Sequence, residues 1–169
     1  SMTCLGATLA ADGRIGSDLS RRIGAAQNDF RALAKVWKHT LLNRRKTLRT
    51  YSALVETKLL YGLATACFTK AEPRRLDGFQ AECLTIIMGV LPSHILRVSN
   101  ASVRTEARYE HASVLLLRKQ LSLFGKVLRS EPQSPMRRVS FVGDTTRIAT
   151  YQYVRRFGRP KKEFLSTVM

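Results

Sequence analysis

The spacing of apolar residues predicts a chain built mainly from helices. After Ser17, a suitable N-cap, apolar residues recur every three or four positions, which is typical of one stripe of a long helix. The predicted stripe consists of Leu19, Ile23, Ala26, Phe30, Leu33 and Trp37. The opposite face carries Arg31, Lys35 and Lys38 at helical spacing, and Arg21 and Arg22 lie near the start of the same helix.

A second helix is predicted to begin after Asn43, which can cap it. Its first turns carry the cations Arg44, Arg45, Lys46 and Arg49. Its predicted inward face contains Leu48, Tyr51, Val55, Leu59 and Gly62. A glycine inside a helix costs about 1 kcal/mol relative to alanine, so Gly62 indicates either a helix break or a close helix contact. The apolar residues on both sides of it favour the contact.

Three further helices follow in the prediction. The first covers residues 72–88, with Gly89 as its C-cap and with an inward face of Leu76, Phe79, Cys83, Ile86 and Ile87. A short helix begins at Asn100 and turns Val103 and Ala107 inward. The last covers residues 111–129, and its predicted inward face consists of Val114, Leu117, Leu121, Phe124 and Leu128.

The two ends of the chain differ from this helical middle. Residues 3–9 are short and apolar and precede the turn signal Asp12-Gly13, which predicts a short strand or hairpin remnant. After Pro135 the sequence becomes irregular and basic, so we expect a weakly structured tail. We therefore predict a mainly α chain with segments 1–16, 17–95, 96–135 and 136–169: a strand and turn, a helical bundle, a downstream helical segment and a basic tail.

The net charge of the chain indicates which class of partner it binds. Among 169 residues, 29 Lys and Arg stand against 12 Asp and Glu, which gives a formal net charge of +17. The excess extends from Arg14 to Lys162, so we expect a polyanionic partner, with nucleic acid ahead of an anionic membrane. The alternative is that the charge only keeps the protein soluble, for which a magnitude of about 2 to 8 suffices. Cations in the first turn of a helix oppose its dipole, so the cluster after Asn43 favours an external anion.

Other functional classes find little support in the sequence. Cys4, Cys67 and Cys83 are odd in number and widely spaced, which indicates reduced thiols and an intracellular protein. The most apolar run, residues 58–68, is shorter than the roughly 18 residues of a spanning helix. No close Cys or His pair suggests zinc, and no nucleophile motif or phosphate-binding loop occurs. Glu106, Glu110 and His111 could line one helical face as a nuclease site, although a solvated face explains them better.

An ordered series of short motifs connects these elements to a known family. It comprises Cys4-Leu5-Gly6, Asp12-Gly13, Leu59-Leu60-Tyr61-Gly62, Arg75-Leu76-Asp77 with Phe79, Cys83-Leu84, Phe124-Gly125 and Gly158-Arg159-Pro160-Lys161-Lys162. Their order and spacing resemble the C-terminal region of non-LTR (LINE-type) retrotransposon reverse transcriptases over nearly the whole chain. Cys4 stands where the family pattern has Tyr, and Ala66 and Phe164 stand where it has Trp.

The resemblance implies that different segments of the chain correspond to different parts of a reverse transcriptase. Residues 1–16 correspond to the palm edge near the primer grip, residues from 17 to about 89 to a thumb-like three-helix unit, and residues from 103 onward to the helices behind the thumb. The catalytic aspartates of the palm, with their Mg²⁺, are expected upstream of Ser1. This implies an RNA-directed DNA polymerase as the parent, a nuclear location, and a chain that by itself binds no cofactor and catalyses no reaction.

The sequence thus predicts a site for RNA and DNA in the form of a template–primer duplex. The residues expected to face phosphates are Arg21, Arg22, Arg31, Lys35, Lys38, Arg44, Arg45, Lys46 and Arg49. Phosphate contacts position a duplex without reading its sequence. Two alternatives stay open: a free-standing helical DNA- or RNA-binding protein derived from such an element, and a protein-interaction module whose charge is incidental.

Overall fold

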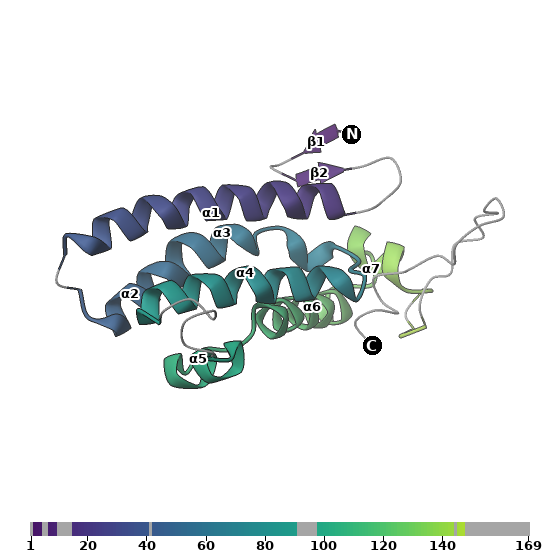
Figure 1. The fold of residues 1–169 in the computed structure, drawn as a ribbon. Coiled ribbons are helices and arrows are strands. Elements are labelled where there is room, and N and C mark those ends of the chain that lie inside the picture. Colours follow the sequence, from purple (N-terminus) through teal and green to yellow (C-terminus); the bar gives the residue numbers. More distant parts are fainter. Residues whose placement is uncertain are drawn as a thin grey trace.

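The computed structural model describes residues 2–4, 7–9, 15–40, 42–90, 98–143 and 145–147, and most of them are helical (Figure 1). Two short strands, β1 (Met2–Cys4) and β2 (Ala7–Leu9), pair antiparallel with Thr3 opposite Thr8. Residues 3–9 therefore contain parts of two strands rather than one, because the two halves of this segment pair with each other. Strand β2 lies against the first helix. The predicted turn at Asp12-Gly13 lies outside the described residues.

Helix α1 (Gly16–Lys38) spans 23 residues. It packs through the predicted stripe, since Leu19, Ala26 and Phe30 are buried and the other three stripe residues are partly buried against them. The prediction of Ser17 as its N-cap is wrong. The cap position belongs to Ile15, which makes no side-chain hydrogen bond, because Ser17 already lies inside the first turn.

The second predicted helix is three joined segments. Helix α2 (Arg44–Tyr51) begins as predicted after Asn43, whose side chain accepts a hydrogen bond from the Lys46 N–H at 2.9 Å. The chain continues through a π-helical segment, η1 (Ser52–Glu56), into α3 (Thr57–Leu59). Tyr51, Val55 and Leu59 are buried along these segments, which confirms that part of the predicted inward face.

The prediction that Gly62 makes a close contact inside a helix is wrong. The helix ends at Leu59, and Gly62 is exposed with a φ of +68°, in the left-handed region that favours glycine. The turn frees the Tyr61 carbonyl, which accepts a 2.5 Å hydrogen bond from Arg22 Nη1. A short 3₁₀ segment, η2 (Leu63–Thr65), follows.

Helix α4 (Ala71–Met88) lies beside α1 and ends, as predicted, at a left-handed Gly89. Leu76, Phe79 and Cys83 are buried, but Ile86 is 53% exposed and does not belong to the inward face predicted for it. Helix α5 (Asn100–Ala107) begins where the sequence predicts and packs Val103 against Leu84 and Met88 of α4.

Helix α6 (Ala112–Arg129) turns a different face inward from the one predicted. Val114, Leu117 and Leu121 are 40%, 42% and 47% exposed, whereas Ala112, Leu116, Gln120 and Val127 are buried. This helix carries apolar residues on two faces, and contacts with α4 decide its rotation. Gln80 Oε1 accepts from the Ala112 N–H at 3.0 Å, and Asp77 Oδ1 accepts from the Ser113 N–H at 2.9 Å. These two side chains cap α6 from a neighbouring helix.

The chain after Pro135 also departs from the prediction of an irregular tail. Residues Pro135–Ser140 form helix α7, which packs on the C-terminal half of α6. Phe141 is 2% exposed, with its ring centroid 6.0 Å from that of Phe124. Arg137 adds a hydrogen bond to the Leu128 carbonyl. The final part of the predicted tail, residues 148–169, lies outside the described residues.

One hydrophobic core joins α1, α2, η1, α3, α4 and the start of α6. At its centre Tyr51 contacts the rings of Phe30 and Tyr109 edge-on, with both centroids 6.0 Å away. Next to this core, the buried Glu56 carboxylate accepts hydrogen bonds from Ser52, Gln80 and Tyr109. Among the described residues, no helix has both the length and the hydropathy that crossing a membrane demands.

Candidate nucleic-acid interface

The most one-sided charge in the chain lies in residues 30–55, which we call the basic segment. It holds seven cations and no Asp or Glu: Arg31, Lys35, Lys38, Arg44, Arg45, Lys46 and Arg49. The segment runs from the C-terminal half of α1, through the turn after it, into α2 and η1. Figure 1 shows the end of α1 and the start of α2 at the same end of the molecule. The fold therefore gathers these cations at one end of the bundle.

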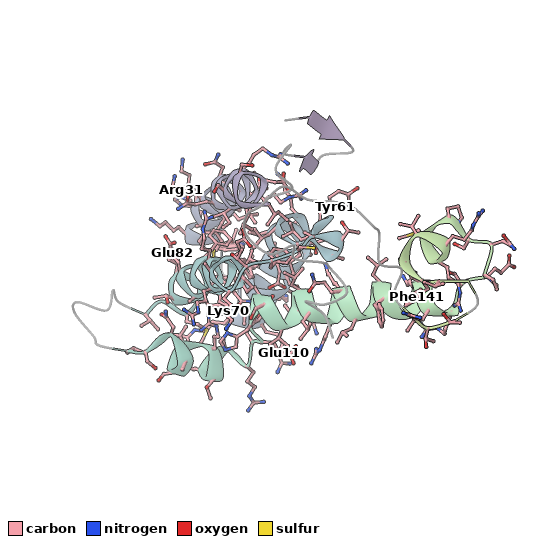
Figure 2. All side chains as sticks on the ribbon, turned by 90° about the vertical axis from the view of Figure 1, so that its right-hand side faces the viewer. Arg31, Tyr61, Lys70, Glu82, Glu110 and Phe141 are labelled. Atoms are coloured by element: carbon pink, nitrogen blue, oxygen red, sulfur yellow. The ribbon has the colours of Figure 1, made fainter. Side chains whose placement is uncertain are left out.

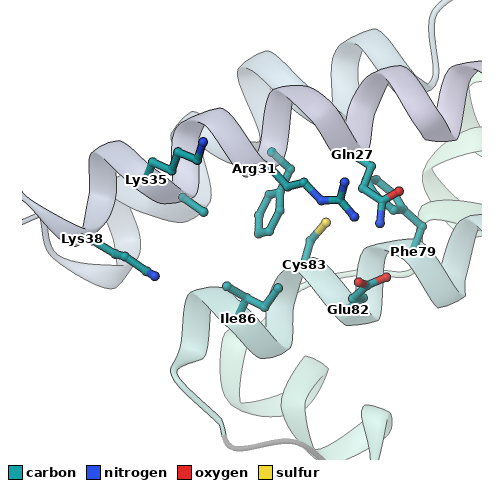
Figure 3. A pocket seen from close by; sticks show the side chains of 10 residues that line it. Gln27, Arg31, Lys35, Lys38, Phe79, Glu82, Cys83 and Ile86 are labelled. Carbon is teal, nitrogen blue, oxygen red and sulfur yellow. The ribbon is translucent and has the colours of Figure 1, made fainter.

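The three α1 cations of the basic segment line a surface groove. The groove lies between α1 and α4, has a volume of about 250 Å³, and is bordered by Arg31, Lys35 and Lys38 on the α1 side (Figure 3). All three side chains are exposed, and none forms an ion pair with another described residue. They are available to an external anion.

The four α2 cations are all exposed: Arg44, Arg45 and Lys46 lie in the first turn of the helix and Arg49 lies in its last turn. Arg44 lies 3.5 Å from the Glu106 carboxylate of α5, but both side chains are more than half exposed, so this contact is weak. Arg45, Lys46 and Arg49 form no ion pair with another described residue. The first-turn cations oppose the helix dipole, and a bound phosphate would remove that repulsion.

Arg21 and Arg22 behave differently from the basic segment. Arg22 is 6% exposed, donates to Asp18 Oδ2 at 2.6 Å, and ties α1 to the turn at Tyr61. Arg21 is half exposed and donates to Asp18 Oδ1 at 2.7 Å. Asp18 thus pairs with both arginines, and Arg22 lies inside the protein rather than on the surface where a phosphate would bind. The carboxylate four residues before Arg22 is the sequence signal for this role.

The groove also contains residues that sequence analysis missed or assigned only to the core. Its floor is apolar and is built from Phe30, Phe79 and Cys83, and Ile86 forms its open edge. Glu82 lies on the α4 side (Figure 3). The exposed Ile86 is a signal that only the structure reveals, because its position in the helical repeat matches the buried face. Figure 2 shows Arg31 and Glu82 on the same side of the bundle, away from Tyr61.

The floor of the groove is chemically inert. Cys83 is 1% exposed, and burial, with a smaller contribution from Glu82, raises the pKa of its thiol to about 12. Burial likewise raises the pKa of Tyr51, which packs beside it. A thiol reacts as the thiolate, so Cys83 is a neutral core residue and no nucleophile at ordinary pH.

Several carboxylates of the described residues form ion pairs or helix caps within the fold. Asp29 pairs with Lys58 at 2.5 Å, and Glu110 pairs with Arg118 through both oxygens. Asp77 caps α6 and lies 3.5 Å from His111 Nδ1. No group of three or more His, Cys, Asp or Glu in the described part of the chain could hold a metal ion. Glu106, Glu110 and His111 are therefore not brought together as such a group.

A second surface feature lies on α6. Val114, Leu117 and Leu121 form an exposed apolar stripe on a helix that holds four cations and no carboxylate. Arg118 and Arg129 follow one edge of the stripe at helical spacing. Sequence analysis found this stripe but placed it in the core.

Comparisons of the chain with protein families, with curated proteins and with solved structures find no match.

Proposed function

We propose that this chain grips the phosphate backbone of a template–primer duplex without reading its sequence, as the thumb region of a retrotransposon-type reverse transcriptase. The observation that carries the proposal is the basic segment: seven cations within residues 30–55, no carboxylate among them, gathered at one end of the bundle. Six of the seven form no ion pair with another described residue. Unpaired surface cations on adjacent helices suit phosphates, which supply most non-specific affinity.

The architecture is compatible with this role. Helix α1, the α2 to α3 segments and α4 pack around one core, as a three-helix unit would. The ordered motifs that resemble LINE-type reverse transcriptases support the polymerase context, the parent RNA-directed DNA polymerase and a nuclear location. Arg22 is excluded from the proposed interface because it is buried against Asp18. Arg21 and Arg44 contribute less because each already pairs with a carboxylate.

Fluorescence anisotropy with a labelled RNA–DNA duplex tests the proposal. If the six cations without an ion pair meet phosphates, the log of the association constant falls against log salt with a slope of about −5. Lys35→Gln with Lys38→Gln should make the slope less negative by about 2. The matched control is Lys119→Gln with Lys126→Gln, which removes the same charge from exposed positions on α6. Equal effects of the two pairs would contradict an interface at the basic segment, and a flat salt response would contradict backbone gripping.

The proposal also concerns catalysis. In the reverse transcriptases that the motifs resemble, the catalytic aspartates belong to the palm and not to the thumb. We therefore expect the 169-residue chain to incorporate no deoxynucleotide on a primed RNA template with Mg²⁺. Incorporation that follows the purified protein through chromatography and exceeds a heat-inactivated control would contradict the assignment to a thumb region.

One observation favours a second function, a protein contact through α6. The apolar stripe of Val114, Leu117 and Leu121, beside cations and without a carboxylate on the helix, fits an acidic amphipathic helix. Binding of an acidic amphipathic peptide to the wild-type chain that is lost in Leu117→Lys would support this role. It does not compete with the basic segment, which lies on other helices.

A further inference from the structure

We propose that the groove between α1 and α4 is a binding site for one unpaired nucleotide of the gripped nucleic acid. Its base would lie on the apolar floor, and the phosphates on either side would meet Arg31, Lys35 and Lys38. This inference deepens the proposed function and rests on it. It adds a contact to a base, whereas the basic segment alone contacts only the backbone.

The shape and chemistry of the groove favour a base. A volume of about 250 Å³ lies below the roughly 300 to 1,000 Å³ of sites for drug-sized ligands, so the groove suits a single nucleoside rather than several. Phe79 and Cys83 form an uncharged floor, and Ile86 leaves an apolar edge open to solvent. Bases present flat apolar faces to such surfaces whatever their sequence.

The spacing of the cations favours a strand over a small anionic ligand. Lys38 lies seven positions after Arg31, which is about 10 Å along the helix axis. One carboxylate or phosphate group cannot meet cations spread over this length, whereas successive phosphates of a strand can. The side chains of all three cations border the same groove (Figure 3). The groove therefore fits a polyanion better than a fatty acid.

Glu82 favours a base that carries an exocyclic amino group. This carboxylate lies on the α4 side of the groove, opposite the cations, and it is exposed. A carboxylate repels phosphate but accepts a hydrogen bond from an exocyclic amino group such as cytosine N4. The phosphates are thus directed to the α1 side and the base toward α4.

The experiment compares two probes by fluorescence anisotropy: a short duplex with a cytidine overhang, and the same duplex whose overhang consists of abasic residues. Both carry the same number of phosphates, so any difference in affinity comes from the base. We expect the cytidine probe to bind the wild-type chain about ten-fold more tightly. Equal affinity for both probes would overturn the groove inference while leaving the proposed backbone contact intact. If the wild-type chain showed no salt-dependent binding to a duplex without an overhang, the proposed function itself would be wrong.

Ile86→Trp locates the base, because the larger side chain fills the edge of the groove. We expect it to bring the ratio of the two affinities close to one while the blunt duplex binds as before. Val36→Trp is the matched control, since Val36 is 55% exposed on α1 and does not line the groove, compared with 53% for Ile86. It should retain the ratio. A ratio that survives Ile86→Trp, or that both variants abolish, would overturn the assignment of the base to this groove. The wild-type comparison requires no variant and tests the inference even if Ile86→Trp unfolds.

Discussion

The two halves of α1 carry similar numbers of cations but use them in different ways. In the N-terminal half, Arg22 is buried, pairs with Asp18 and holds the turn at Tyr61. In the C-terminal half, Arg31, Lys35 and Lys38 are exposed along a groove and form no ion pair with another described residue. The difference follows from one carboxylate one helical turn away. Arg22, which pairs with a buried carboxylate, is part of the fold, whereas the cations of the C-terminal half are available to a partner.

The largest effect expected from this comparison is on stability. Arg22→Ala removes the hydrogen bonds to Asp18 and to the Tyr61 carbonyl, while Arg21 still pairs with Asp18, so the free energy of unfolding should fall by about 2 to 4 kcal/mol. Arg31→Ala, on the exposed half of the same helix, should change it by less than about 0.5 kcal/mol. Urea denaturation of both variants measures the contrast. Equal stabilities would mean that Arg22 is not a structural residue.

The turn that Arg22 holds gives the next prediction. Gly62→Ala places a Cβ on a backbone with a φ of +68°, and we expect a loss of about 1 to 2 kcal/mol. Gly24→Ala is the matched control: Gly24 lies inside α1, and nothing lies within 4 Å of an added Cβ. It should gain up to about 1 kcal/mol through helix propensity. Thermal melting measures both effects. If both variants shifted the melting temperature in the same direction, the assignment of Gly62 to a left-handed turn would be wrong.

Beneath the C-terminal half of α1, Cys83 makes the stability depend on pH. Its folded pKa of about 12 exceeds its ordinary value of 9.0, so the native state holds the proton more tightly. The resulting stability is fully present below pH 9 and is lost as the pH rises from 9 toward 12, by at most about 1.4 kcal/mol per pH unit. Tyr51 and Tyr109, whose pKa values burial also raises, act in the same direction.

Unfolding by urea at pH 8 to 10 measures this dependence. Cys83→Ala should show a shallower decline than the wild type, whereas Cys67→Ala, at a half-buried thiol, should follow the wild type. Identical curves for all three proteins would mean that Cys83 is not desolvated in the groove floor.

The smallest expected effect is that reversing the charge of two α2 cations stabilises the fold while it weakens binding to a duplex. Arg45→Glu with Lys46→Glu replaces cations in the first turn of α2 by carboxylates, which interact favourably with the helix dipole. Each change should add about 0.3 to 1 kcal/mol to the free energy of unfolding, while affinity for a duplex falls. Melting curves and anisotropy on one preparation test both parts. A loss of stability, or unchanged binding, would show that the cations of α2 serve the fold rather than a partner.

Much of the helical architecture is readable from local sequence. Asn43 caps α2, Gly89 ends α4 in the left-handed region, and α5 begins at Asn100, all as predicted. These features depend on interactions within a few residues: a side chain that accepts from a nearby N–H, or a glycine that tolerates positive φ. The buried stripe of α1 was equally clear, because its helix has one apolar face.

Other features required knowledge of what lies across the core. Helix α6 has two apolar faces, so periodicity alone cannot choose between Leu116 and Leu117, and caps from Asp77 and Gln80 on α4 make the choice. At Gly62 the sequence allows either a helix break or a close helix contact. The structure has the break, and Arg22 stabilises it by donating to the Tyr61 carbonyl, 39 residues away in sequence.

What the sequence by itself determined is therefore the helical class, the main caps, and a basic segment with no carboxylate. Tertiary structure alone decided which cations are structural, which face of α6 is buried, and that Ile86 borders a groove rather than the core. The physical reason is the distance along the sequence over which each interaction acts. Helix periodicity and capping act over one or two turns, whereas the burial of a particular side chain depends on distant segments that pack against it.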